Sequence, residues 1–121
     1  MRLLEFDDRL TPEMVGRSSF CKADFYADRR RGIERILIEG EKGEPAAVMT
    51  YRVLDVPAII AGIYTWVHPD YRGGTYVLDA VNEAKEEHGV TVAISEVPNR
   101  KVAEKYCELG GSEIRDGIMY V

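Results

Sequence analysis

Three short apolar runs separated by turn-forming residues occupy the middle of the chain. They cover residues 33–39, 46–54 and 59–67, and they contain many Val, Ile, Thr and Tyr residues, which favour strands. The connectors Glu41-Lys42-Gly43-Glu44 and Asp55-Val56-Pro57 contain the Gly and Pro that are typical of tight turns. Because such short connectors join neighbouring antiparallel strands, we predict a three-stranded meander.

A helical region is predicted before these strands. Thr11 can accept a hydrogen bond from a free amide of the first turn, and Pro12 is tolerated at the first helical position. The region extends to about Arg30, with a break point at Gly16 to Ser19, where Gly and paired Ser weaken helix propensity. Its apolar side chains are expected in the core: Met14, Val15, Phe20, Cys21, Phe25 and Tyr26.

The spacing of apolar residues becomes helical again after Gly74, and Gly89 is placed to end that helix. We then expect a short strand over 90–94, a helix over 99–109, and a final strand or small hairpin over 113–121 that turns at Asp116-Gly117. This order favours an α/β (α+β) fold, with a single mixed, mostly antiparallel twisted sheet flanked by helices. Residues 1–121 show no repeat or linker, so we predict a single domain.

Composition narrows the class of protein. A chain of 121 residues with 45% hydrophobic residues can bury a core, and no apolar stretch approaches the roughly 20 residues that span a bilayer. The first residues do not resemble a signal peptide, so we expect a cytoplasmic location and no membrane partner. The net charge of −5 argues against a nucleic-acid partner.

Arg29, Arg30 and Arg31, with Lys22 and Arg35 nearby, form a basic cluster. A solvated helix end explains this cluster, and a contact for an acidic partner is the alternative.

The cysteines and histidines do not have the spacing of metal ligands. Cys21 and Cys107 lie far apart, and neither His68 nor His88 completes a ligand set with them. We therefore expect no metal, and we interpret both thiols as buried or half-buried structural cysteines.

The stretch VHPDYRGGTYVLDA, residues 67–80, joins a strand-like run to a helix-like run. A loop of this kind gathers unpaired backbone N–H groups at the positive end of a helix dipole, which is a geometry that binds anions. Gly73 and Gly74 would let a phosphate approach the backbone, and Arg72 would add positive charge. A flexible turn is the alternative interpretation of the same residues.

This stretch and VPNRKVAEKYCELGG, read together, resemble the GNAT superfamily of acyl-CoA-dependent N-acyltransferases. Val67, Pro69, Arg72 and Gly73 match the Val-x-Pro-x-x-Arg-Gly-x-Gly-x-Gly/Ala loop of that family, and the second motif is matched by Asn99, Tyr106, Leu109 and Gly110. The resemblance is specific from about Ile59 to Gly110 and implies an acyl-CoA N-acyltransferase-like fold. It also implies acetyl-CoA or a similar acyl-CoA as cosubstrate, bound through Val67, Arg72, Gly73, Gly74, Thr75 and Asn99.

The resemblance further implies transfer of the acyl group to a primary amine of a small molecule or protein. A backbone N–H near Ile63 to Trp66 would stabilise the thioester oxygen. Tyr106 occupies the position of the acid that protonates the departing thiolate, although an aromatic core residue explains it equally well. The segment AGIYTWV has no carboxylate, so the candidate bases are Glu96, just past the strand predicted over 90–94, and His68, beside the loop.

Departures from the family pattern favour a second hypothesis. Thr75 stands where a Gly is expected, Val77 where Gly or Ala is usual, the segment AGIYTWV has no carboxylate, and the chain is short. Gly111 also replaces the usual aromatic residue. A β-branched side chain crowds a phosphate, so the alternative is a non-catalytic GNAT-like domain that acts as a binding or structural protein.

The acceptor and the oligomeric state are open at this point. Asp24, Tyr26 and Asp28 suit a cationic amine acceptor, and a solvated helix face explains them equally. An exposed edge strand near the C-terminus would favour a homodimer.

Overall fold

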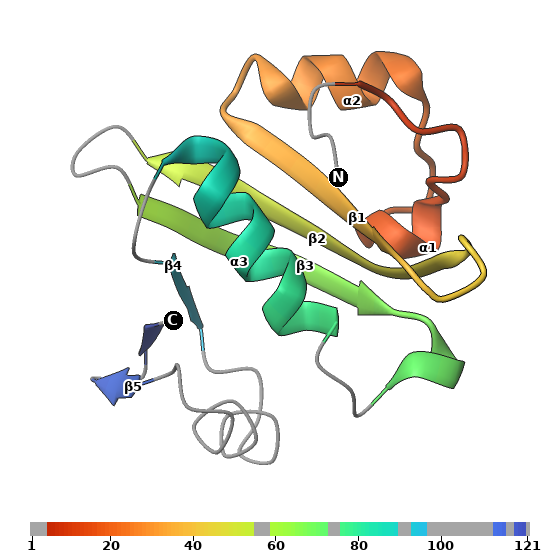
Figure 1. The fold of residues 1–121 in the computed structure, drawn as a ribbon. Helices are drawn as coiled ribbons and strands as arrows, with labels where there is room; N and C mark the ends of the chain where they lie inside the picture. Colours follow the sequence, from red (N-terminus) through yellow and green to blue (C-terminus); the bar gives the residue numbers. More distant parts are fainter. Residues whose placement is uncertain are drawn as a thin grey trace.

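The computed structural model describes residues 5–54, 59–72, 76–89, 93–96, 113–115 and 118–120. Six strands among these residues form one sheet with the order β1-β2-β3-β4-β6-β5 (Figure 1). In chain order the elements are α1 (Pro12–Val15), α2 (Lys22–Arg29), β1 (Ile33–Glu39), β2 (Pro45–Leu54), β3 (Ile59–Val67), the 3-10 turn η1 (Pro69–Tyr71), α3 (Tyr76–His88), β4 (Ala93–Glu96), β5 (Glu113–Arg115) and β6 (Ile118–Tyr120).

The predicted meander is confirmed. Strands β1 and β2 pair antiparallel from Ile33 with Arg52 to Glu39 with Pro45, and β3 pairs antiparallel with the other side of β2. Strand β4 then pairs parallel with β3, whereas β6 pairs antiparallel with both β4 and β5. The sheet is therefore mixed and mostly antiparallel, as the order of elements predicts.

The helix ends are set by the residues that the sequence suggested. The Thr11 hydroxyl accepts a hydrogen bond from the Met14 N–H at 3.4 Å, and α1 stops at Gly16, whose φ of 70° is in the left-handed region. Gly89, with a φ of 64°, follows the last residue of α3. The predicted break and both helix ends are thus confirmed.

The C-terminal part differs from the prediction at one strand. The described strand β4 is Ala93–Glu96, so Glu96 belongs to the strand and does not follow it, while residues 90–92 lie outside the described residues. Its pairing with Ile118 of β6 accounts for the extension, because a third strand continues the ladder there. The predicted hairpin is confirmed by β5 and β6, while the predicted helix over 99–109 and the turn at 116–117 lie outside the described residues.

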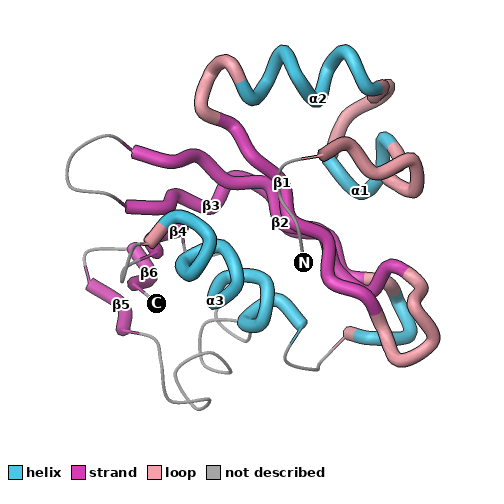
Figure 2. The backbone as a smooth tube through the Cα atoms, turned by 45° about the horizontal axis from the view of Figure 1, so that its top comes forward, coloured by secondary structure: helices cyan, strands magenta, loops and turns pink. Residues whose placement is uncertain are grey.

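Helices cover both faces of the first three strands. Figures 1 and 2 show α3 on one face and α1 with α2 on the other. Alternate residues of each strand point to opposite faces. Two apolar clusters result: Ile36, Met49 and Tyr51 pack with Ala80, Val81 and Ala84 of α3, whereas Leu37, Val48 and Trp66 pack with Leu10 and with Phe25 of α2.

The C-terminal end of α3 is fixed to the sheet by a partly buried hydrogen bond. The Tyr51 hydroxyl lies 2.9 Å from Nε2 of His88, and the Tyr51 side chain is completely buried. Burial raises the pKa of Tyr51, so its hydroxyl keeps its proton at neutral pH. This anchor holds the helix at a constant position above β2.

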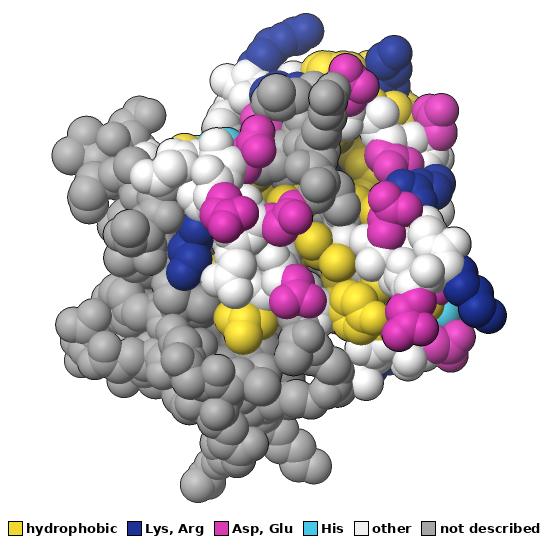
Figure 3. Space-filling model, in the orientation of Figure 1, with side chains coloured by type: hydrophobic (Ala, Val, Ile, Leu, Met, Phe, Trp, Pro, Cys, Tyr) yellow, Lys and Arg dark blue, Asp and Glu magenta, His cyan; other side chains and the backbone are white. Residues whose placement is uncertain are grey.

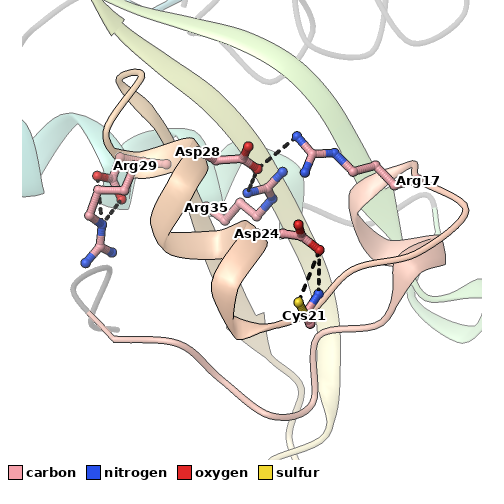
Figure 4. Close-up of polar contacts among 7 residues, drawn as sticks. Arg17, Cys21, Asp24, Asp28, Arg29 and Arg35 are labelled. Carbon is pink, nitrogen blue, oxygen red and sulfur yellow. Dashed lines mark hydrogen bonds and ion pairs between the residues drawn. The ribbon is translucent and has the colours of Figure 1, made fainter.

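Charged residues are buried beneath α2. One carboxylate oxygen of Asp28 accepts from Nη1 of Arg35 at 2.7 Å and pairs with Nη2 of Arg17 at 2.9 Å (Figure 4). Burial alone would raise the pKa of Asp28, but the hydrogen bonds from Arg17 and Arg35 outweigh it and lower the pKa. Burial lowers the pKa of Arg35 against the effect of Asp28, yet a guanidinium remains charged at any ordinary pH.

Two expectations from the sequence are wrong in this region. Arg35 does not belong to an exposed basic cluster, because its side chain is buried and paired. Arg29 likewise pairs with Glu34 at 3.1 Å. Asp28 is buried and does not lie on a solvated helix face. These charges therefore hold α2 on the sheet and are not presented to a partner.

Cys21 is exposed, which contradicts the expectation of a buried thiol. It stands at the N-cap of α2, where the chain has left α1, and its N–H donates to the Asp24 carboxylate at 3.0 Å. Figure 4 shows the thiol beside that carboxylate, 3.3 Å away. Capping geometry thus overrides the apolar character of Cys21, while Cys107 lies outside the described residues.

Candidate functional site

Strand β3 carries a β-bulge near its middle. Thr50 of β2 pairs with Tyr64, whereas the next residue, Tyr51, pairs with Gly62, so that Ile63 is the extra residue on β3. A bulge leaves backbone groups outside the ladder and changes the direction of the neighbouring side chains. The side chains of Ile63 and Tyr64 are 52% and 40% exposed as a result.

Strands β3 and β4 separate at this bulge. Among the described residues, their parallel pairing consists of Ile60 with Ala93 and Ala61 with Ile94. Glu96 lies three residues beyond Ala93 and Ile63 lies three residues beyond Ile60, so both follow the last paired residues of the two strands. Figure 1 shows β4 directed away from β3 beyond their contact. The divergence leaves the bulge of β3 without a paired β4 residue in the described part of the chain.

Backbone hydrogen bonds fix the turn that follows β3. The His68 N–H donates to the Ala46 carbonyl at 2.8 Å, and the Tyr71 N–H donates to the His68 carbonyl at 2.9 Å. Nε of Arg72 then donates to the Val67 carbonyl at 3.2 Å. The turn therefore holds Arg72 against the end of the strand, with the rest of its guanidinium exposed.

Aromatic rings connect this turn to the start of α3. The Tyr71 ring makes edge contacts with His68 at 5.6 Å and with Tyr76, the first residue of α3, at 5.1 Å between centroids. Tyr71 also lies against Gly40 of the β1–β2 turn, where a Cβ would be 2.5 Å from its hydroxyl oxygen. A Cβ there would require the Tyr71 ring and the Glu44 side chain to move, so the β1–β2 turn packs closely against the Tyr71 ring.

The first turn of α3 is linked to the turn after β3 by the contact between Tyr71 and Tyr76. Its backbone N–H groups have no partner within the helix and carry the positive end of the helix dipole. Val77 is the second residue of this helix, so its N–H belongs to that set. Asp79 lies in this first turn and Asp70 in the 3-10 turn that precedes it, and these exposed carboxylates weaken the attraction for an anion.

The geometry of His68 bears on its predicted role as a base. Its Nδ1 accepts a hydrogen bond from the Asp70 N–H at 3.1 Å, as the cap of the 3-10 turn. A neutral imidazole that accepts at Nδ1 carries its proton on Nε2. The ring is also packed between Trp66 and Tyr71, so in this structure it forms part of the turn.

The structure describes only part of the predicted site. Val67, His68 and Arg72 are brought together after β3, and Glu96 stands at the end of β4. The other predicted site residues lie outside the described residues: Gly73, Gly74, Thr75, Asn99 and Tyr106.

Sequence analysis missed the bulge at Ile63 and the aromatic contact between Tyr71 and Tyr76. Gly62 within a predicted strand was the available signal for the bulge, because an isolated Gly in a strand often marks one.

Tyr64 connects the bulge to α1. Its hydroxyl donates to the Glu13 carbonyl at 3.4 Å, and a Cβ on Gly16 would lie 2.9 to 3.0 Å from three of its ring carbons. Gly16 is therefore required both for its positive φ and for the approach of the ring.

A separate hollow of about 520 Å³ lies between residues 5–10 and β1. Arg9 closes part of its rim through bonds to Asp7 at 2.9 Å and to the Gly43 carbonyl at 2.7 Å. Arg35 also lines this hollow, and its buried Nε has no hydrogen-bond partner in the described part of the chain. The lining residues include none of those that the sequence predicts for the site, so we locate the candidate site at β3 and the turn after it.

Two further observations limit the kinds of site and location. No group of three or more His, Cys, Asp or Glu side chains that would hold a metal occurs within the described ranges. None of the described helices is long and apolar enough to cross a membrane.

Comparison with known proteins gives a match at the level of structure. No family model matches the sequence, and no curated protein matches it. An acetyltransferase of the GNAT family from Staphylococcus aureus matches with a TM-score of 0.58 and 13% identity, over 98% of this chain and 96% of that one. The ribosomal-protein-S18-alanine N-acetyltransferase from Escherichia coli matches with a TM-score of 0.57 and 18% identity, over 85% and 77%.

Nourseothricin acetyltransferase is also similar in structure, with a TM-score of 0.52 and 18% identity over 75% of this chain. The matched region spans 63% of that longer protein. The chain therefore has the fold of the GNAT acyl-CoA N-acyltransferases, and the predicted fold class is confirmed.

Proposed function

We propose that this protein is an acyl-CoA-dependent N-acyltransferase that moves an acetyl group from acetyl-CoA to a primary amine. The observation that carries the proposal is the bulge at Ile63 where β3 and β4 diverge. Such a gap accepts an extended chain between two strands, and the bulge offers backbone donors at its end. The proposal places the protein in the cytoplasm as a single domain.

The phosphates of the cosubstrate would be held by the turn after β3 and the start of α3. Arg72 supplies the positive charge, and the N–H groups of the first turn of α3 supply donors. Gly73, Gly74, Thr75 and Val67 complete this binding segment in the proposal, and Asn99 contributes from further along the chain. Asp70 and Asp79 reduce the net positive charge here, so we expect added salt to lower the affinity for the phosphates less than it would at a purely basic loop.

Acetyl-CoA supplies the activated acyl group, and the residues of this chain position it and move protons. A backbone N–H between Ile63 and Trp66 donates to the thioester oxygen as negative charge develops there. The amine nitrogen forms a bond to the carbonyl carbon while the carbon–sulfur bond breaks. Tyr106 gives a proton to the departing sulfur and so completes the transfer.

Glu96 is the stronger candidate for the base that takes a proton from the amine. It ends β4, the strand that pairs with β3 before the bulge, and in the proposal its carboxylate takes the proton directly or through a water. His68 remains the second candidate from the sequence, but its Nδ1 already accepts a hydrogen bond and its Nε2 carries the proton.

A non-catalytic domain of the same fold is the alternative function. The observations that favour it are Asp79 in the first turn of α3, the Thr75 and Val77 side chains in place of smaller residues, and the absence of a carboxylate from β3. Such a protein would bind neither acetyl-CoA nor an amine and would act through a protein partner. Its edge strand β5 would then be available for a second copy of the chain.

A steady-state assay of free coenzyme A thiol tests the proposal. Parent protein with acetyl-CoA and a panel of primary amines should release thiol in an amine-dependent manner. Tyr106→Phe should lower kcat by at least about tenfold with little change in the KM for acetyl-CoA. Amine-independent release, or none at all, would reject the acyltransferase and leave the non-catalytic alternative.

A further inference from the structure

We propose that the acceptor is a small primary amine with an apolar body, and that Ile63 and Tyr64 contact that body. This inference rests on the proposed function, because it names the class of substrate for the same site. It is carried by the positions, exposure and supports of these two side chains at the bulge.

The two reactants would approach the gap between β3 and β4 from opposite faces of the sheet. Helix α3, whose start would hold the phosphates of the cosubstrate, packs on the face that carries Met49 and Tyr51. Tyr64 contacts α1 and Trp66 packs with Phe25, so both belong to the other face. With the cosubstrate on the face of α3, the amine reaches the thioester carbon from the face of α1.

Ile63 and Tyr64 are the large hydrophobic side chains that stay exposed in the described part of the chain, at 52% and 40%. They are consecutive, and both lie at the bulge where the reaction would occur. Covering an exposed apolar side chain with an apolar ligand is favourable because it removes that surface from water. Two such side chains at one reaction centre are suited to an apolar substituent on the amine.

The Tyr64 ring is held in one orientation before any ligand binds. One side of the ring packs against Gly16, and its hydroxyl is bonded to the Glu13 carbonyl. A ring fixed in this way loses little conformational entropy when a ligand covers its free side. Tyr64 therefore serves as a rigid contact surface.

The charges near α1 do not suit an acceptor with a second positive charge. The Asp28 carboxylate is buried and already paired with Arg17 and Arg35. The Asp24 carboxylate accepts from the N–H and the thiol of Cys21. Figure 4 shows both carboxylates turned to these partners. Arg17, adjacent to Gly16 and 38% exposed, adds a positive charge that repels a cationic body.

The test compares three amines with the parent protein at saturating acetyl-CoA: 2-phenylethylamine, ethylamine and 1,4-diaminobutane. All three present a primary amine, and they differ in the body that follows it. We expect kcat/KM for 2-phenylethylamine to exceed that for each of the other two by at least about tenfold. Enzymes commonly show a ratio of this size between substrates that differ by an apolar group.

Two variants test whether Ile63 causes that preference. Their new side chains, Val and Thr, have nearly the same shape and differ in polarity. Ile63→Val keeps an apolar β-branched side chain and should change the preference by less than about twofold, whereas Ile63→Thr should reduce it by about three- to tenfold. The KM for acetyl-CoA should stay the same in both variants. Equal effects of Val and Thr, or a parent that prefers 1,4-diaminobutane, would overturn the inference.

The outcomes also separate this inference from the proposed function. A parent that binds acetyl-CoA but acetylates none of the three amines overturns the small apolar acceptor and leaves an acyltransferase for another amine. A parent that neither binds acetyl-CoA nor releases thiol overturns both.

Discussion

Strands β2 and β3 are neighbours in one sheet, yet they differ in how they use their residues. Strand β2 buries six consecutive residues, Ala46 to Tyr51, between helices on both faces. Strand β3 interrupts its pairing with a bulge and leaves residues 63–65 exposed beside it. The core therefore lies on β2. The candidate site lies on β3, where fewer side chains are buried near the bulge. Substitutions in β2 should therefore lower stability, and substitutions in β3 should change activity.

The largest effect is expected at Tyr51. Replacing its completely buried side chain with Ala removes a large apolar surface and leaves a cavity, so Tyr51→Ala should lower the free energy of unfolding by about 3–5 kcal/mol. Tyr51→Phe, the control, removes only the hydrogen bond to His88 and should cost about 1 kcal/mol. Urea unfolding followed by circular dichroism measures both. A Tyr51→Ala loss below about 1.5 kcal/mol would contradict the role of β2 as the core.

The next effect concerns the charges that hold α2 over the strands. Asp28→Asn leaves Arg35 buried without a carboxylate, and it should lower the free energy of unfolding at pH 7 by about 3 kcal/mol. The pKa of Asp28 is lowered in the folded state, so its contribution is present above the ordinary value of 3.8 and is lost as pH falls through the lower folded pKa. Urea unfolding measured at several pH values from 6 to 2 should therefore show a free energy of unfolding that falls less with pH in Asp28→Asn than in the parent.

A smaller loss is expected where α1 meets the bulge. Gly16→Ala places a Cβ in a left-handed conformation and against the Tyr64 ring, and should cost about 2 kcal/mol. Gly89→Ala has a similar φ with no atom within 4 Å of the new Cβ, so it should cost only about 1 kcal/mol. The difference between the two variants measures the contact with Tyr64, and equal losses would show that this contact contributes nothing.

The smallest effect on stability is expected on β3 itself. Ile63→Thr changes an exposed side chain at the bulge, and it should shift the free energy of unfolding by less than about 0.5 kcal/mol. Thermal unfolding measures this directly. A loss above about 1.5 kcal/mol would show that Ile63 is part of the core, and would remove the distinction between β2 and β3.

Much of the fold follows from the sequence because its signals are local. The apolar runs in residues 33–39 and 46–54, the Pro at the start of α1 and the glycines at 16 and 89 each set a boundary within a residue or two. The charges were harder to place. Asp28 and Arg35 have the composition of a solvated helix end, and only the packing of α2 on β1 brings them together in the interior.

The candidate site was less accessible to sequence analysis. Val67, Pro69 and Arg72 form a contiguous motif, so the turn could be found. The bulge depends on the register of β3 against β2, and the Tyr71 ring depends on Gly40, thirty-one residues earlier in the chain. Long-range pairing of this kind leaves no local pattern. Figure 3 shows acidic side chains over the outer side of α3. The face that carries the proposed phosphate site is therefore not broadly basic, and charge alone does not mark the site.

The most direct test of the central claim is thermal unfolding with and without acetyl-CoA, on the parent and on Arg72→Ala. A ligand at about 100 times its Kd stabilises the folded state by roughly 2.7 kcal/mol, which raises the Tm of a domain of this size by several degrees. The account predicts that rise in the parent and a smaller one in Arg72→Ala, whose Tm without ligand should match the parent. No rise in the parent would show that the turn after β3 does not bind the cosubstrate, and would contradict the acyltransferase.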